Sequence, residues 1–241
     1  PQQDGLGGKV DLRRQTLMTI RELRKLPGVV YAEPNYLLRP YLEPNDTYYY
    51  LQWNLRMANL PAAWDLETGR ESVIVAVIDT GVLTGHPDLE NQLVPGYDFI
   101  TDLDRAADGD GPDPDPTDMG DPDNPGRSTA FHGTHVAGVI AANSNNNEGI
   151  SGAAWGIKIM PLRALGEFDG SVADVVEAIR YASGLPNSTG LVPQQRAQII
   201  NLSLGTTDYS QTLADAIADA RDAGMIITAA AGNENTATDH Y

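Results

Sequence analysis

The sequence contains no cysteine and few basic residues, and both absences narrow what the protein can be. Without cysteine the chain forms no disulfide and uses no thiol chemistry, although this composition is compatible with secretion. Only 16 Lys and Arg residues face 33 Asp and Glu residues, and the resulting net charge of -17 argues against nucleic acid as a partner. The apolar runs are short and broken by polar residues, so the sequence predicts no membrane-spanning helix.

The length, composition and charge distribution of the sequence are typical of a globular protein with two parts. A chain of 241 residues with 41% hydrophobic and 20% charged residues is long enough for one substantial α/β domain and a smaller piece. Residues 1–40 hold seven Lys or Arg and four Asp or Glu, whereas the remainder holds nine and twenty-nine. A weakly basic leader before a strongly acidic body indicates two units, which we place at residues 1–45 and 46–241.

The larger unit alternates between apolar strands and amphipathic helices. The β-branched run at residues 72–78 is typical of a strand that is covered on both faces of a parallel sheet. Alternation of this kind predicts an α/β fold, with a doubly wound, mostly parallel sheet and helices on both faces. The further strands are expected at 157–162, 198–202 and 225–230, and the helices at 132–142, after Ser171 and at 210–223.

Three motifs each place one polar residue at the edge of an apolar element. Val-Ala-Val-Ile-Asp-Thr-Gly ends a strand with Asp79, Phe-His-Gly-Thr-His-Val-Ala-Gly begins a helix with His132, and Ala-Ala-Ala-Gly-Asn follows a strand with Asn233. Open α/β sheets place their sites at the carboxyl ends of the strands. Such a set suits a nucleophile that is activated by a His, which an Asp orients in turn.

In this order the motifs resemble those of a subtilisin-like serine protease, a member of the subtilase family, over residues 50–235. The resemblance implies that Asp79 orients the imidazole, that His132 is the general base and that Asn233 stabilises the oxyanion. The family's nucleophilic Ser lies in a Gly-Thr-Ser stretch, which this sequence lacks. We therefore expect the Ser beyond Tyr241, in a chain truncated before it, and we expect the chain alone to be inactive. The implied parent is a secreted serine endopeptidase that acts on proteins or peptides.

The resemblance also implies how a substrate would bind. The Asn-Leu-Ser-Leu-Gly segment would pair with an extended peptide through its backbone, which recognises main chain rather than sequence. The Ala-Ala-Gly segment before Asn233 would form the floor of the specificity pocket. The implied substrate-binding residues are Ser203, Leu204, Gly205, Ala230, Ala231 and Gly232.

An Asn-rich loop follows the predicted His helix, and its oxygen-rich side chains suit a hard cation such as Ca²⁺. In the family, the loop at this point wraps a calcium ion, so the resemblance implies a calcium-stabilised enzyme. One Asn side chain and three backbone carbonyls would come from this loop, and one carboxylate from the earlier His-Pro-Asp-Leu motif. The implied ligands are Asp88, Ser144, Asn146, Glu148 and Ile150.

A second calcium hypothesis concerns the acidic loop at residues 98–123, which contains ten Asp residues. Such a loop cannot fold by burying apolar surface, and its like charges repel one another. Either it is a mobile acidic loop, or cations neutralise it through oxygen ligands. The candidate ligands are Asp98, Asp102, Asp108 and Asp110.

The first 45 residues resemble the last half of an inhibitory propeptide. Apolar residues recur every three positions in a predicted helix at 16–26, Pro27 and Gly28 end it, and a strand is expected at 29–32 before Glu-Pro-Asn. The resemblance implies a zymogen whose own propeptide, here a truncated small α/β remnant, inhibits it.

Two readings from other classes remain open. The chain could be a non-catalytic, acidic calcium-binding module that keeps a protease-like scaffold. It could also be a metal hydrolase built on Asp79, His132 and His135. However, the zinc-protease signature needs a Glu beside the first His and a four-residue spacing, and the sequence has neither.

Overall fold

The computed structural model describes residues 6–36, 42–120, 130–166, 169–206 and 208–233. The chain divides into two compact units, residues 1–40 and residues 41–241. Among the described residues, no helix has both the length and the hydropathy that crossing a membrane requires.

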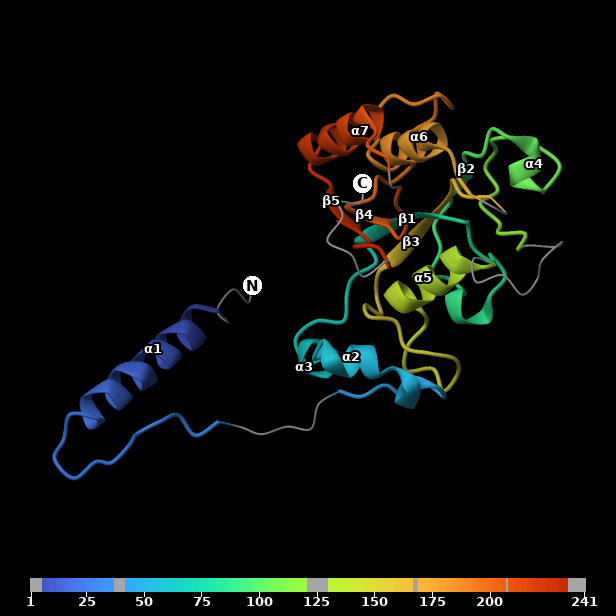
Figure 1. Cartoon of the computed structure of the whole chain (residues 1–241). Helices are drawn as coiled ribbons and strands as arrows, with labels where there is room; N and C mark the ends of the chain where they lie inside the picture. Colours follow the sequence, from blue (N-terminus) through green and yellow to red (C-terminus); the bar gives the residue numbers. More distant parts are fainter. Residues whose placement is uncertain (1–5, 37–41, 121–129, 167–168, 207, 234–241) are drawn as a thin grey trace, which may run out of the picture. The chain divides into compact units, whose positions relative to one another are not determined.

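The centre of the larger unit is a sheet in which all described neighbouring strands run parallel, in the order β2-β3-β1-β4-β5 (Figure 1). Strand β1 lies in the middle and is buried along its whole length, as its β-branched sequence predicts. The strands are β1 (Ile74–Asp79), β2 (Tyr97–Asp98), β3 (Lys158–Arg163), β4 (Ile199–Leu202) and β5 (Ile226–Ala229).

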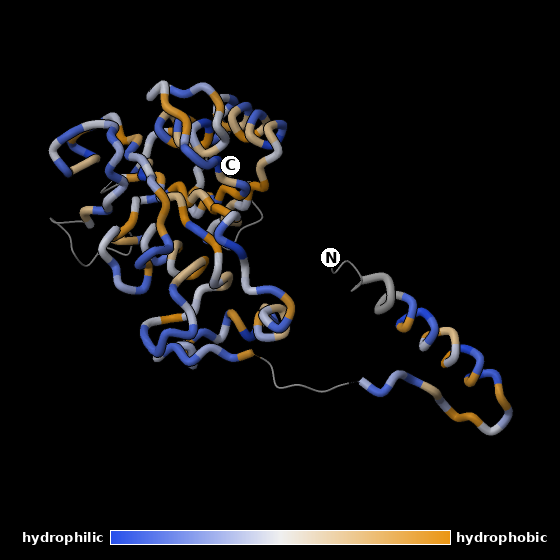
Figure 2. The backbone as a smooth tube through the Cα atoms, turned by 180° about the vertical axis from the view of Figure 1, so that it is seen from behind, coloured by the Kyte–Doolittle hydropathy of each residue, from blue (hydrophilic) through white to orange (hydrophobic). Residues whose placement is uncertain are grey.

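Helices cover both faces of this sheet. Helices α6 (Val172–Ala182) and α7 (Gln211–Asp222) lie on one face, and α5 (His132–Ala141) lies on the other (Figure 1). The even-numbered side chains of β1 pack under α6 and α7, whereas Val75 and Val77 pack under α5. Successive side chains of a strand alternate between its faces, so Asp79 continues the face that α5 covers. Figure 2 shows the apolar residues gathered in these central strands. The predicted doubly wound α/β fold is confirmed.

Serine caps begin the two helices that share a face, as the sequence suggests for Ser171. The Ser171 hydroxyl accepts the N–H of Asp174 at 3.0 Å, and the Ser210 hydroxyl accepts the N–H of Leu213 at 3.3 Å. Short elements complete the unit: η1 (Tyr49–Leu51), α2 (Trp53–Met57), α3 (Leu60–Trp64), η2 (Pro87–Leu89) and α4 (Leu103–Ala106).

The N-terminal unit is simpler than expected. Its helix α1 spans Leu6–Leu23 and so begins ten residues before the predicted helix. The strand predicted at residues 29–32 is wrong, because this segment pairs with no strand among the described residues. A strand needs a hydrogen-bonded neighbour, and the described part of this unit offers only one helix. Several apolar side chains of the described part of this unit stay exposed, such as Leu17, which is 60% exposed.

Candidate active site

Strand β1 and helix α5 bring Asp79 and His132 into direct contact. Asp79 ends β1 and is fully buried, whereas His132 begins α5 with about a third of its side chain exposed. The Nδ1 atom of His132 lies 2.7 Å from Oδ1 of Asp79, so the ring donates Nδ1–H to the carboxylate. The backbone N–H of Thr80 donates to the same oxygen at 2.8 Å. The two residues thus meet as the sequence motifs lead one to expect.

The electrostatics of this pair favour a protonated imidazole. The hydrogen bond that His132 donates to Asp79 raises the pKa of His132 above its ordinary value, and burial of the ring acts in the opposite direction. The charges of Asp79 and of Asp118 also raise the pKa. Since Nδ1 is held by Asp79, the Nε2 atom is the ring nitrogen that remains to take a proton from a reacting group.

Close backbone contact fixes where α5 begins. A Cβ on Gly133 would lie 2.1 Å from the carbonyl oxygen of Gly81 and 3.1 Å from Cβ of Asp79. Real side chains cannot approach so closely, so the residue after His132 must be glycine if the helix is to start this near the strand end. This close packing explains why the His-Gly-Thr-His motif has a glycine directly after His132.

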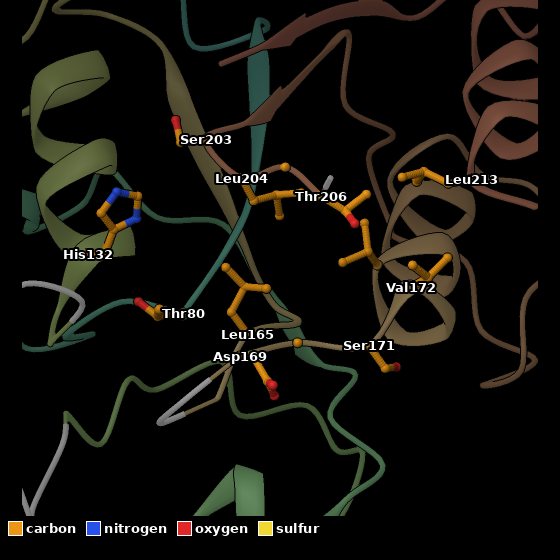
Figure 3. A pocket seen from close by; sticks show the side chains of 13 residues that line it. Thr80, His132, Leu165, Asp169, Ser171, Val172, Ser203, Leu204, Thr206 and Leu213 are labelled. Carbon is orange, nitrogen blue, oxygen red and sulfur yellow. The ribbon is translucent and has the colours of Figure 1, made fainter. Parts of the chain in front are cut away.

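A cleft of about 570 Å³ opens beside this pair (Figure 3). His132 lies on one side of it, while Val172 and Leu213 lie on the opposite side and come from α6 and the start of α7. Its lining is mainly apolar, with Leu165 and Val175 among the further wall residues. A cleft of this size at the carboxyl ends of parallel strands matches the position at which α/β folds bind ligands.

The structure brings only part of the predicted substrate-binding set to the cleft. Ser203, Leu204 and Gly205 line it, directly after β4, and Thr206 lines it as well. The segment 230–232 is exposed after β5 and is not among the residues that line the cleft. Its first N–H donates to the carbonyl of Leu202 at 3.0 Å, which keeps the segment beside the end of β4. Asn233 is exposed and ends the described part of the chain.

The predicted calcium loop curls around Asp88. This carboxylate is 5% exposed, and its Oδ2 accepts the N–H of Ile150 at 2.9 Å. A Cβ on Gly149 would lie 2.0 Å from the same oxygen, so the loop backbone lies directly against the carboxylate. Nδ2 of Asn146 lies 3.4 Å from Oδ1 of Asp88. The hydroxyl of Ser144 is used inside the loop, where it accepts the N–H of Gly152 at 2.9 Å.

Asp46, which the sequence motifs did not indicate, also lies at this loop. Asp46 is 5% exposed, and its Oδ2 accepts the N–H of Asn145 at 2.8 Å, whereas its Oδ1 is buried without a hydrogen-bond partner. Burial raises the pKa of Asp46, and the charge of Asp88 raises it further. Asp46 is about a hundred residues from the loop in sequence, so no local spacing could have indicated it.

In the described part of the acidic loop, a buried arginine contacts two of the Asp residues. Arg163, at the end of β3 and 3% exposed, donates to the carboxylates of Asp98 and Asp108 and to the carbonyl of Ala106. Asp102 caps α4 by accepting the N–H of Asp104 at 3.0 Å. An internal arginine and backbone N–H groups therefore already bind three of the four candidate calcium ligands. The fourth, Asp110, is exposed, and the last two Asp residues of the loop lie outside the described residues.

His132 and His135 do not form a joint metal site. His135 lies with His86 and Asp88 at a different cavity, of about 490 Å³, while His132 lines the cleft described above. Within the described residues, no group of three or more His, Cys, Asp or Glu side chains is arranged to hold a metal ion. The geometry thus gives no support to a hydrolase that holds its metal on these histidines.

A buried carboxylate bonded to an imidazole at the edge of a cleft defines the acid–base half of a serine-hydrolase centre. Comparison with known proteins agrees with this class. Residues 70–241 match the model of the subtilase family of peptidases. The chain belongs to the subtilase family.

Several characterised proteins are similar to the chain. An extracellular protease of Xanthomonas campestris pv. campestris is 40% identical over 233 residues, which cover 91% of this chain and 40% of the relative. A thermophilic serine proteinase of Bacillus sp. (strain AK1) is 38% identical over 221 residues, which cover 91% of this chain and 48% of the relative. The chain thus spans less than half the length of these relatives.

Solved structures show the same fold. A protease from Pseudoalteromonas arctica PAMC 21717 superposes with a TM-score of 0.73 at 42% identity, over 80% of this chain and 60% of that one. Fervidolysin from Fervidobacterium pennivorans, described as a keratinolytic enzyme related to subtilisin, gives a TM-score of 0.56 at 31% identity, over 78% and 25% of the two chains.

Proposed function

We propose that the protein containing this chain is a serine endopeptidase that hydrolyses peptide bonds in proteins. The observation that carries the proposal is the contact between His132 and Asp79 at the wall of a cleft. His132 takes the proton of the nucleophilic Ser through Nε2 and later gives it to the leaving amine. Asp79 holds the imidazole in the required tautomer and stabilises its protonated form.

Other residues of the chain would bind the substrate and the developing charge. The backbone of Ser203, Leu204 and Gly205 runs along the cleft, where it can pair with an extended peptide. Segment 230–232 would floor the specificity pocket, and the side-chain amide of Asn233 would donate to the oxyanion. The sequence contains no Gly-Thr-Ser stretch. The nucleophilic Ser is therefore assigned to sequence beyond residue 241.

Calcium would stabilise this fold at the loop around Asp88. Asp46 and Asp88 are both buried, the charge of Asp88 raises the pKa of Asp46, and one oxygen of Asp46 has no hydrogen-bond partner; this combination favours a hard cation with oxygen ligands. The loop's carbonyls at Asn147 and Gly149 accept hydrogen bonds from Thr47 and Tyr48, and they are not the carbonyls assigned to the ion. The proposed ligands are the side chains of Asp46, Asp88 and Asn146 and the carbonyls of Ser144, Glu148 and Ile150.

We further propose that the enzyme is secreted as a zymogen. Relatives from Xanthomonas and Dichelobacter are named extracellular proteases, which supports secretion. Residues 1–45 would be the remnant of an inhibitory propeptide. Their exposed apolar side chains, such as Leu17, Val30 and Tyr31, need a partner surface to be buried.

A serine-directed phosphonate tests the activity. The protein that contains the chain should hydrolyse a protein substrate and should lose this activity on stoichiometric labelling by the phosphonate, and His132→Ala should abolish both. A zinc-selective chelator should leave activity unchanged. If the chelator stops hydrolysis and the phosphonate does not, the serine mechanism is overturned. A folded protein without hydrolysis or labelling would favour the non-catalytic calcium-binding module.

A further inference from the structure

Asp118 is a buried carboxylate that the proposed mechanism does not use. It is 5% exposed and lies in the acidic loop, beside the turn that follows Asp79. Its N–H donates to the carbonyl of Val82 at 2.9 Å, and the N–H of Val82 donates to the carbonyl of Pro116 at 3.0 Å. A Cβ on Gly81 would lie 2.4 Å from that Pro116 oxygen. The loop therefore packs backbone to backbone against the Asp-Thr-Gly turn.

A hydrogen-bond chain runs from Asp118 to the start of α5. The Thr80 hydroxyl lies 2.5 Å from Oδ2 of Asp118, and the N–H of Gly133 donates to the same hydroxyl at 2.9 Å. The hydroxyl has one proton and already accepts from Gly133, so it donates to Asp118. The carboxylate is an acceptor on both of its oxygens, so it can take this hydrogen bond and still accept a second one. Gly133 directly follows His132, so these hydrogen bonds connect Asp118 to the backbone beside the general base.

A second connection reaches His132 from its other side. The N–H of Gly120 donates to Oδ1 of Asp118 at 2.8 Å, and a Cβ on Gly120 would lie 2.7 Å from the ring of Phe131. Phe131 immediately precedes His132 and adopts a left-handed backbone conformation, with φ of 57°. A bulky residue keeps this costly conformation only where its surroundings enforce it. The packed Gly120 backbone is one such constraint.

We propose that Asp118 is a positioning residue of the active centre. Through Thr80 on one side and Gly120 on the other, it fixes the start of α5 and thereby the alignment of the His132 imidazole with the Asp79 carboxylate. Asp118 is not among the residues that line the cleft, and its positioning effect passes through these neighbours, in addition to the charge by which it raises the pKa of His132. This inference rests on the proposed peptidase function only for its kinetic test, because the alignment itself can be measured without turnover.

Near-isosteric variants interrupt this series of hydrogen bonds while they keep side chains of nearly the same size at residues 80 and 118. In Asp118→Asn the amide can accept from Thr80 or from Gly120 but not from both, since one of its ends is now a donor. Thr80→Val removes the hydroxyl at nearly constant shape, whereas Thr80→Ser keeps the hydroxyl and serves as the conservative rescue. The matched control is Asp110→Asn, which makes the same charge change at an exposed position of the same loop.

The kinetic test uses the whole enzyme, with active sites counted by phosphonate titration so that unfolded molecules do not enter kcat. Misalignment of a general base lowers turnover more than substrate binding, and we expect kcat to fall about 10-fold to 100-fold in Asp118→Asn and in Thr80→Val. KM should stay within about twofold, and Thr80→Ser should recover most of the loss. A kcat per titrated site equal to that of Asp110→Asn would overturn the proposal.

The second test needs no turnover and separates this inference from the proposed function. We expect the Nδ1 proton of His132 to give a downfield NMR signal while it is bonded to Asp79, and the signal is followed in the whole enzyme without substrate. We expect it to broaden or shift in Asp118→Asn and Thr80→Val but not in Asp110→Asn. An unchanged signal in the first two variants would overturn the positioning role. If the enzyme proves not to be a serine peptidase, this signal still decides the question.

Discussion

Replacing Arg163 with alanine tests whether an internal arginine, rather than calcium, organises the acidic loop. The change leaves Asp98, which is 1% exposed, with the N–H of Ile100 at 2.7 Å but without a cation, and it removes a donor from the carbonyl of Ala106. Removing one partner of a buried ion pair costs about 3–5 kcal/mol. For a domain of this size, a loss of about 4 kcal/mol lowers the melting temperature by roughly 8–16 °C.

Urea unfolding with and without calcium provides the assay. The control is Arg70→Ala, because Arg70 pairs with Glu67 at the surface, where removing an ion pair costs about 0–1 kcal/mol. Arg163 is buried and has three partners, whereas Arg70 is exposed and pairs with one carboxylate, so the difference between the variants measures what the buried network adds. A loss in Arg163→Ala no larger than in the control would refute the reasoning. Recovery of the lost stability by calcium in this variant would show that the loop binds a cation after all.

Three further predictions concern the active site and the calcium loop. Asp79→Asn should lower kcat about 10⁴-fold, by analogy with triads of other serine proteases, as steady-state kinetics would show; a loss below tenfold would contradict the assigned role. Because a general base must be neutral and Asp79 raises the pKa of His132, kcat/KM should rise as pH rises through that pKa. Its midpoint should move to lower pH in Asp79→Asn, and an upward shift would be inconsistent with this sign. EGTA should lower the melting temperature, since saturation at a hundred times Kd stabilises by about 2.7 kcal/mol. Asp46→Asn should shrink this difference and Asp110→Asn should not; equal shifts would remove Asp46 from the ligands.

The sequence could predict the fold and the central pair because both depend on local patterns. A β-branched run predicts a buried strand, and a polar residue at its carboxyl end falls at the edge where parallel strands place their sites. Asp79 and His132 each stand at such an element boundary, so topology alone brings them near each other. The strand predicted at residues 29–32 was wrong because a local pattern cannot supply a partner: its valines have no neighbouring strand in the part of this unit that the structure describes.

Residues whose roles depend on distant partners gave no such signal. Asp46, Asp118 and Arg163 occupy a turn, an acidic run and a strand end, and in sequence each looks like an ordinary solvated charge. What distinguishes them is that each is buried against a group far away in the sequence. The contacts of Asp118 with Thr80, of Asp46 with Asn145 and of Arg163 with the acidic loop join residues that lie 38 to 99 positions apart. In the described part of the acidic loop, composition predicts repulsion, and Arg163 from β3 offsets it at Asp98 and Asp108. A count of like charges therefore cannot tell a calcium loop from one closed by an arginine, because the deciding cation comes from another element.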